Sequence, residues 1–326
     1  MTATEAGGVS DQVRAVARRA LAIRKSGILI PFLFTFVVLS VVSPSFLKFQ
    51  NLTNILDQQA GIIIVACAGT LVLIAGGIDL SIGAIYGLAG AVSAQIATTE
   101  PAPVAILGGL ALGLLFGLAN GLVVSRFRVN ALIATLAMSF VVAGIGAVLT
   151  KGNLVVVFDR PEFQVFAATR ILGITSAAWM MMVIVIAVGV LLARTKFGRY
   201  VYATGANVEA ARLGGVRVNG IRVATFALSG TAAALAGVID ASRVLSAQAS
   251  SGQFLTFTVL TGVVVGGTSI MGGEGSIRRT VIGCLFVALV ANGFNLLGLD
   301  PFYQQITLGV ILLLAVGIDA WSRRFS

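Results

Sequence analysis

Residues 102–124 read APVAILGGLALGLLFGLANGLVV, and this stretch contains no charged side chain. A bilayer core is crossed by about 20 predominantly apolar residues in a helix, so the stretch is long enough to span it. Gly113, Gly117 and Gly121 repeat every four residues within it, a spacing that lets two helix backbones approach closely inside a membrane. The stretch therefore predicts a membrane-spanning helix that packs tightly against another helix.

The remainder of the chain has the same character. Of its 326 residues, 58% are hydrophobic and only 10% are charged, and the mean hydropathy is +1.02. Ten spans would use about 200 residues, which leaves too little chain for a soluble catalytic domain. We therefore expect an all-α polytopic membrane protein with about ten transmembrane helices, at 27–43, 56–75, 78–98, 102–124, 130–149, 176–193, 223–245, 257–271, 280–297 and 302–320.

The distribution of positive charge predicts the topology. If the N-terminus is cytoplasmic, most of the 22 Lys and Arg fall on the cytoplasmic side, as the positive-inside rule requires. The exceptions are Lys48, Lys151, Arg160, Arg170 and Arg243. This predicts a multi-pass protein with both termini in the cytoplasm. Its expected parts are a basic amphipathic segment (1–26) along the inner leaflet and a transmembrane domain (27–326) that carries a cytoplasmic loop (194–222).

Missing residue types exclude several kinds of chemistry. The chain has no histidine, which removes imidazole acid–base catalysis, His-ligated metals and Ser-His nucleophile pairs. Cys67 and Cys284 lie in apolar stretches, where we expect them to pack as small hydrophobic side chains, although a disulfide between them stays possible. The net charge of +10 follows the loop pattern of a membrane protein and does not indicate nucleic-acid binding.

Two glycine-rich breaks interrupt the apolar runs, at Gly76-Gly77 and again around 266–273. Paired glycines end or unwind a helix, and backbone exposed at membrane depth must be satisfied by protein or by a water-lined path. We expect Asp79 to be the N-cap of a helix that starts at Leu80, and favour this role over contact with a substrate. The breaks are nevertheless candidate elements of a substrate pathway.

The other polar residues of the spans are hydroxyls and amides. We see no charged relay in the spans of the kind that proton- or sodium-coupled carriers use, so a neutral polar solute is the expected cargo. The candidate substrate-pathway residues are Gly76, Gly77, Asp79, Ser81, Asn120, Thr268, Ser269, Asn292, Asn295 and Gln304.

The loop 194–222 is predicted to contain one short helix. Asn207 can cap it, Glu209 suits the positive end of its dipole, and Gly214-Gly215 can end it. Ala210, Ala211 and Leu213 give this helix a small apolar face. A helix this short needs a surface to rest on, which is either a groove on another protein or the membrane domain of the chain itself.

Four motifs follow one another in a recognisable order. They are GGIDLSIG at 76–83, GRYVYATGANVEAARLGGV at 198–216, GGTSIMGGEGSI at 266–277, and NGFNLLG at 292–298 followed by Tyr303-Gln304-Gln305. Together they resemble the membrane-spanning permease subunits of bacterial ABC importers for simple sugars, the ribose-permease type. The resemblance covers most of the chain, from about residue 45 to 320.

The resemblance implies an ABC importer type II-like permease fold in the bacterial inner membrane and the import of a ribose-like or other simple sugar. It implies two permease copies, expected to form a homodimer, a cytoplasmic ABC ATPase and a periplasmic sugar-binding protein. ATP and Mg would be bound by the ATPase, and no cofactor by this chain. The residues that it assigns to ATPase coupling are Asn207, Glu209, Ala210, Ala211, Arg212, Leu213 and Gly215.

The sequence also departs from the family pattern. Asn130-Ala131 stands where the family usually has prolines, and Glu274 stands where a basic residue is frequent. The motifs therefore do not specify the sugar, and a nucleoside or a branched amino acid is a possible cargo of the same architecture. The alternative from another class is a stand-alone secondary carrier or facilitator for a small neutral polar solute, which would need no ATPase.

Overall fold

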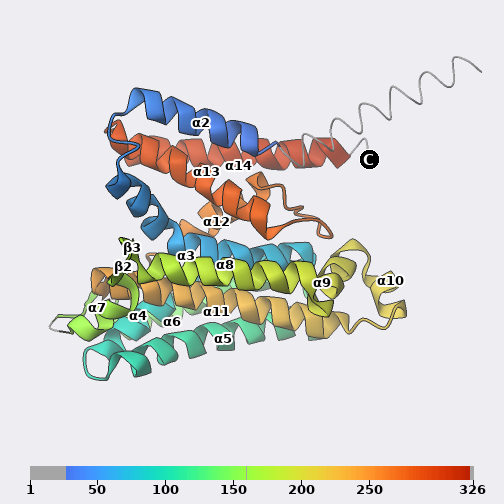
Figure 1. Cartoon of the computed structure of the whole chain (residues 1–326). Coiled ribbons are helices and arrows are strands. Elements are labelled where there is room, and N and C mark those ends of the chain that lie inside the picture. The colour runs from blue at the N-terminus through green and yellow to red at the C-terminus, as the bar shows by residue number, and fades with distance from the viewer. Residues whose placement is uncertain (1–26, 159, 324–326) are drawn as a thin grey trace, which may run out of the picture.

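The computed structural model describes residues 27–158 and 160–323, and it is helical throughout apart from two pairs of two-residue strands (Figure 1). The predicted segment 1–26 lies outside the described residues. The helices are α2 (Leu29–Val42), α3 (Phe49–Ile74), α4 (Ile82–Ala97), α5 (Ala102–Arg126), α6 (Ala131–Thr150), α7 (Pro161–Ala168), α8 (Ser176–Arg194), α9 (Lys196–Ala206), α10 (Val208–Leu213), α11 (Val218–Val244), α12 (Leu255–Val265), α13 (Ile277–Leu296) and α14 (Pro301–Arg323). The strands β1 (Val155–Val156) and β4 (Ser246–Ala247) pair antiparallel, as do β2 (Arg170–Ile171) and β3 (Ile174–Thr175).

Among the described residues, 7 helices are long and apolar enough to cross a membrane. They are α3, α5, α6, α8, α11, α13 and α14, while α2, α4 and α12 are shorter apolar helices. Each of the ten predicted spans overlaps one of these helices. The protein is thus an all-α, multi-pass membrane protein, and the number of crossings stays a prediction.

Helix α11 lies at the centre of the larger group of helices and packs against α3, α4 and α5 (Figure 1). Its contact with α5 depends on the glycine repeat. A Cβ atom on Gly117 would lie 2.5 Å from the carbonyl oxygen of Phe226, and one on Gly121 would lie 2.7 Å from the Cα of Val223. Since real Cβ atoms do not come this close, only glycine permits this approach, and the predicted close helix packing is confirmed.

The second group of helices contains α2, α12, α13 and α14. Helix α13 contacts α2, α12 and α14, and it joins this group to the first through α3 (Figure 1). Cys67 on α3 and Cys284 on α13 are both buried and unbonded, which confirms their role in packing.

Several helix boundaries differ from the sequence predictions, and α9 was not predicted; α3, for example, begins at Phe49, seven residues before the predicted start at 56. Helix α4 begins at Ile82, after Ser81, because residues 78–81 are non-helical and their backbone is held by side chains of other helices. Helix α12 ends at Val265, followed by Gly267 with a φ of +82°. The loop 194–222 holds two helices, α9 and α10, where one was predicted, because Thr195 caps a further helix by accepting a hydrogen bond from the Gly198 N–H at 3.2 Å.

Candidate functional site

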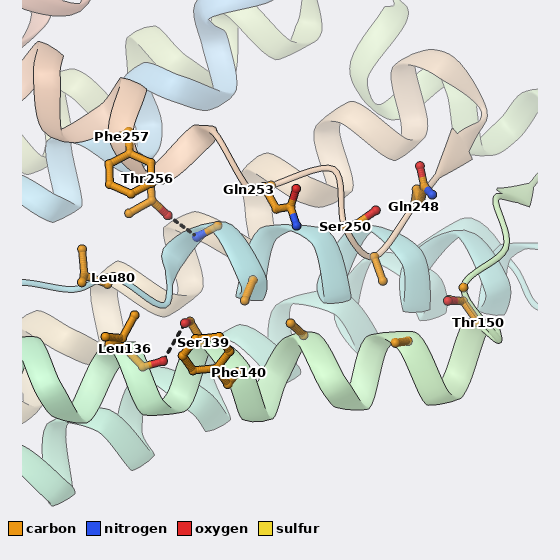
Figure 2. A pocket seen from close by; sticks show the side chains of 17 residues that line it. Leu80, Leu136, Ser139, Phe140, Thr150, Gln248, Ser250, Gln253, Thr256 and Phe257 are labelled. Atoms are coloured by element: carbon orange, nitrogen blue, oxygen red, sulfur yellow. Dashed lines mark hydrogen bonds between the residues drawn. The ribbon is translucent and has the colours of Figure 1, made fainter. Parts of the chain in front are cut away.

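A cleft of about 330 Å³ opens between α4, α6 and the connection formed by residues 248–257. Figure 2 shows Gln248, Ser250 and Gln253 on this connection where it crosses α4, with Ser139 and Phe140 opposite them on α6. Among the residues that the structure describes, none that lines the cleft is charged. Its polar side chains are the hydroxyls and amides of Ser139, Thr150, Gln248, Ser250, Gln253 and Thr256, and its aromatic side chains are Phe140 and Phe257.

Glycines of α4 hold the connection in place. A Cβ on Gly87 would lie 2.9 Å from the carbonyl carbon of Ala249, so the connection rests directly on the helix backbone. The hydroxyl of Thr256 accepts a hydrogen bond from the Gly83 N–H at 3.1 Å, drawn in Figure 2. This N–H belongs to the first turn of α4, where no helical carbonyl is available to accept from it. The wall of the cleft is therefore fixed by backbone contacts.

The first glycine break is a buried polar network. The Asp79 carboxylate accepts hydrogen bonds from the Ser81 N–H at 3.0 Å, the Ser81 hydroxyl at 2.6 Å and the Ser229 hydroxyl at 2.8 Å. Asn120 donates to the Ser81 hydroxyl at 2.8 Å. The prediction that Asp79 is the N-cap of a helix starting at Leu80 is wrong by two residues, because Ser81 holds that position and the carboxylate instead binds the turn that precedes the helix.

Thr135 of α6 ties this break to the helix that lines the cleft. Its hydroxyl accepts from the Leu80 N–H at 3.0 Å, and its single proton lies within reach of two carbonyls, that of Ile78 at 3.1 Å and that of Ala131 in its own helix at 2.9 Å. Asp79, Ser81 and Asn120, three of the candidate pathway residues, are thus joined by hydrogen bonds, but none of them lines the cleft.

The second glycine break meets the first one beneath α9. The Gly273 N–H donates to the Ile74 carbonyl at 2.9 Å, and a Cβ on Gly272 would lie 2.9 Å from the Cα of Gly76. A Cβ on Gly205, near the end of α9, would overlap the Ile74 carbonyl and lie 2.6 Å from the Gly273 nitrogen. We call this contact of residues 74–76, 203–206 and 272–275 the glycine junction.

Tyr202 adds a side-chain contact to the glycine junction. Its hydroxyl donates to the Gly275 carbonyl at 2.8 Å. Burial raises the pKa of this phenol and Arg279 nearby partly offsets the rise, so the group stays protonated and able to donate at neutral pH. Thr204 lies in the junction and Thr268 in the second break, four residues before Gly272, and both hydroxyls are buried without a hydrogen-bond partner among the described residues.

Helix α10 projects from the glycine junction as an extension of α9. Asn207 ends α9, and its side chain accepts from the Ala210 N–H at 3.0 Å, so the predicted cap is present. The predicted apolar face is divided: Ala211 is buried against the protein, whereas Leu213 is 90% exposed. Glu209 and Arg212 form an exposed ion pair at 2.8 Å, and Gly215 ends the region with a φ of +80°.

The remaining candidate pathway residues lie away from the cleft and from the network around Asp79. Thr268 and Ser269 are buried in the second break. Asn292 of α13 exchanges hydrogen bonds with Asn51 of α3 at 2.9 and 3.2 Å, which joins the two groups of helices. Asn295 is exposed at the end of α13, and Gln304 is half-buried in the first turn of α14. None of the ten candidates lines the cleft.

A charged cluster that lies at the opposite end from α10 was not anticipated from the sequence. Asp240 of α11 pairs with Arg243 and accepts a hydrogen bond from the Tyr86 hydroxyl. Arg243 also donates to the Asp57 carbonyl at 2.8 Å. The spacing of Asp240 and Arg243 in the sequence could have indicated this ion pair, since residues three apart share one helix face. A cavity that Asp240 and Tyr86 line shares Gln248 with the cleft.

Known proteins resemble this chain along most of its length. It is 40% identical to the ribose import permease protein RbsC of Escherichia coli (strain K12) over 295 residues, which cover 89% of this chain and 92% of that protein. Identity to the ribose import permease protein RbsC of Bacillus subtilis (strain 168) is 38% over 294 residues, 89% of this chain and 91% of that protein. The L-arabinose ABC transporter permease protein AraH of Azospirillum brasilense is 35% identical over 302 residues, 92% of this chain and 89% of that protein.

No solved structure matches the chain significantly. A family model does match, over residues 51–316, and its description is "Branched-chain amino acid transport system / permease component". The matched region contains the cleft, both glycine breaks and α10. The chain therefore belongs to this family of transport permeases.

Proposed function

We propose that this chain is the permease subunit of an ATP-driven ABC importer that moves a monosaccharide, ribose or a similar simple sugar, into the bacterial cytoplasm. The observation that carries the proposal is the cleft, whose polar lining consists only of hydroxyl and amide side chains. Such groups hydrogen-bond an uncharged polyol without leaving a buried charge unpaired. The two phenylalanines would cover the apolar C–H faces of a sugar ring.

The same lining argues against a branched-chain amino acid, the solute named in the family description, as the transported molecule. A free amino acid carries an ammonium and a carboxylate, and burying both requires charged or strongly dipolar partners. The cleft supplies none among its side chains. The named relatives for ribose and L-arabinose agree with the sugar proposal.

Energy would reach the cleft through α10. We place α10 on the cytoplasmic side, seated in a groove of an ATPase that binds ATP and Mg itself, with Leu213 and Ala210 as its exposed contact residues. A displacement of α10 moves α9, and the glycine junction passes this to both helix breaks because their backbones touch. Thr135 links the first break to α6, one wall of the cleft. A second arrangement of the junction would also give the Thr204 and Thr268 hydroxyls their partners.

The proposed assembly has two copies of this chain in a type II-like arrangement, both termini in the cytoplasm. We place the second copy against α6, where Phe140 is 71% exposed at the open side of the cleft. A second copy against α6 would complete the open side of the cleft. A periplasmic sugar-binding protein would dock at the opposite end from α10, near α7 and the β1–β4 pair.

Reconstitution into proteoliposomes tests the function. The chain, its ATPase and its binding protein should accumulate labelled ribose or arabinose in the presence of ATP, and should not accumulate labelled leucine. Accumulation of leucine would reject the sugar assignment. Sugar flux through the chain alone, without ATP or partners, would instead favour the facilitator.

Substitutions on α10 test the coupling role. Ala210→Asp and Leu213→Asp each place a charge on its exposed surface and should abolish co-purification with the ATPase while membrane insertion persists. Asn219→Asp is the matched control, since this exposed residue of α11 lies outside α10. ATPase association that survives both α10 substitutions would show that the ATPase docks elsewhere.

A further inference from the structure

A second cavity, of about 360 Å³, lies at the α10 end of the protein and is lined by three arginines. They come from three different segments: Arg128 from the connection between α5 and α6, Arg212 from α10, and Arg222 from α11. Gly76 and Gly77 of the first break form part of its wall. This basic cavity is separate from the cleft, with which it shares no lining residue.

The positive charge of the basic cavity is largely uncompensated. No acidic residue lines it, and the guanidinium groups of Arg128 and Arg222 have no ion-pair or hydrogen-bond partner among residues 27–158 and 160–323. Only Arg212 is paired, with the exposed Glu209. Three guanidinium groups around one cavity repel one another, and an anion that enters it relieves this repulsion.

The lining also indicates the kind of anion. Guanidinium groups bind phosphate oxygens through paired N–H donors, and several arginines can surround a single phosphate. Asn130 and Thr225 also line the cavity and add polar side chains, which suits the oxygens of a phosphate group. Arg128 adopts a left-handed backbone conformation, with a φ of +57°, a strained geometry of the kind found at binding sites.

We propose that the basic cavity is a binding site for a phosphate group, supplied either by the headgroup of an anionic phospholipid or by a soluble phosphate compound. The bound phosphate joins α10 to the Gly76–Gly77 break through Arg212, so its presence favours one arrangement of these two elements. This site is independent of the identity of the transported solute.

Thermal unfolding of the full chain in phosphatidylcholine nanodiscs tests the site. Cys67 and Cys284 are buried, so a thiol-specific dye reacts with them only on unfolding and reports Tm. Inorganic phosphate at ten times its Kd should raise Tm by about 3 °C relative to chloride of equal ionic strength. Arg222→Gln and Arg128→Gln should each weaken phosphate binding by about tenfold or more. Arg217→Gln, at the exposed N-cap of α11 outside the cavity, should bind phosphate normally.

Repeating the measurement in phosphatidylglycerol nanodiscs separates the two sources. If the lipid raises Tm by itself and phosphate adds nothing, the headgroup fills the site; if phosphate still adds its shift, the ligand is soluble.

An equal phosphate shift in the wild type, Arg222→Gln and Arg128→Gln would mean a general salt effect and overturn the proposal. If Arg222→Gln then also lost its ATPase, the arginines would belong to a protein interface. Arg128 is exposed, so Arg128→Gln keeps the test valid if Arg222→Gln does not fold.

Discussion

Alanine at position 205 should disconnect ATP hydrolysis from transport. The added Cβ would overlap the Ile74 carbonyl and lie 2.6 Å from the Gly273 nitrogen, against an ordinary contact of 3.4 Å or more. The three segments must therefore separate by roughly 1–2 Å, which breaks the 2.9 Å hydrogen bond between Gly273 and Ile74. A lost hydrogen bond between buried backbone groups costs about 1–3 kcal/mol, so Tm should fall by several degrees without preventing insertion.

The assay is the ratio of sugar transported to ATP hydrolysed in proteoliposomes that contain the complete transporter. A coupling free energy of about 1–3 kcal/mol corresponds to 5–150-fold, so the ratio for Gly205→Ala should fall at least about fivefold while ATP hydrolysis continues. Gly220→Ala is the matched control, because the nearest atom to its Cβ, on Arg217, would be 3.9 Å away. A wild-type ratio in Gly205→Ala would refute the role of the glycine junction in transmission.

Three further substitutions test other parts of the structure. Thr135→Val removes the hydroxyl that accepts from the Leu80 N–H, which should destabilise the protein by about 1–3 kcal/mol and lower Tm; an unchanged Tm would show that water replaces the hydroxyl. Asp240→Asn weakens the pairing of Arg243. Since Asp240 is 40% exposed, we expect a loss of stability of only about 1 kcal/mol, seen as a small fall in Tm. High salt should lower the Tm of the wild type in the same way, because it screens the same ion pair. Ala143→Trp fills the cleft and should abolish sugar transport while ATPase association persists, whereas Ala187→Trp, on an exposed part of α8, should transport normally; active Ala143→Trp protein would place the pathway elsewhere.

The sequence predicted some local features of the site well. Asn207 caps α10 and Gly215 ends the region with a positive φ, because capping and helix termination depend on residues within one turn. The glycine repeat in α5 likewise predicted close packing, although not that α11 would be the partner. The network around Asp79 was anticipated only in part: the carboxylate was placed as a cap, whereas its contact with Ser229 joins residues far apart in the chain.

The cleft could not be predicted from the sequence. Its lining combines one face of α6 with the start of α4 and the connection 248–257, and none of these stretches is distinctive by itself. The candidates chosen for their polarity are instead buried in networks that hold the breaks together, as Ser81 and Asn120 are. Asp57 and Asp240 were passed over in apolar runs because hydropathy averages over a window and gives single charges little weight.

The amino-acid sequence alone determined that this chain is a multi-pass helical membrane protein and approximately where its ten apolar helices lie, because a helix in lipid satisfies its backbone hydrogen bonds within its own segment. It also placed the two breaks, since paired glycines act locally. The tertiary structure decided which helix faces meet, and so produced the cleft, the glycine junction and the basic cavity. These depend on contacts between residues such as Ile74, Gly205 and Gly273, whose proximity arises only when all the helices pack together.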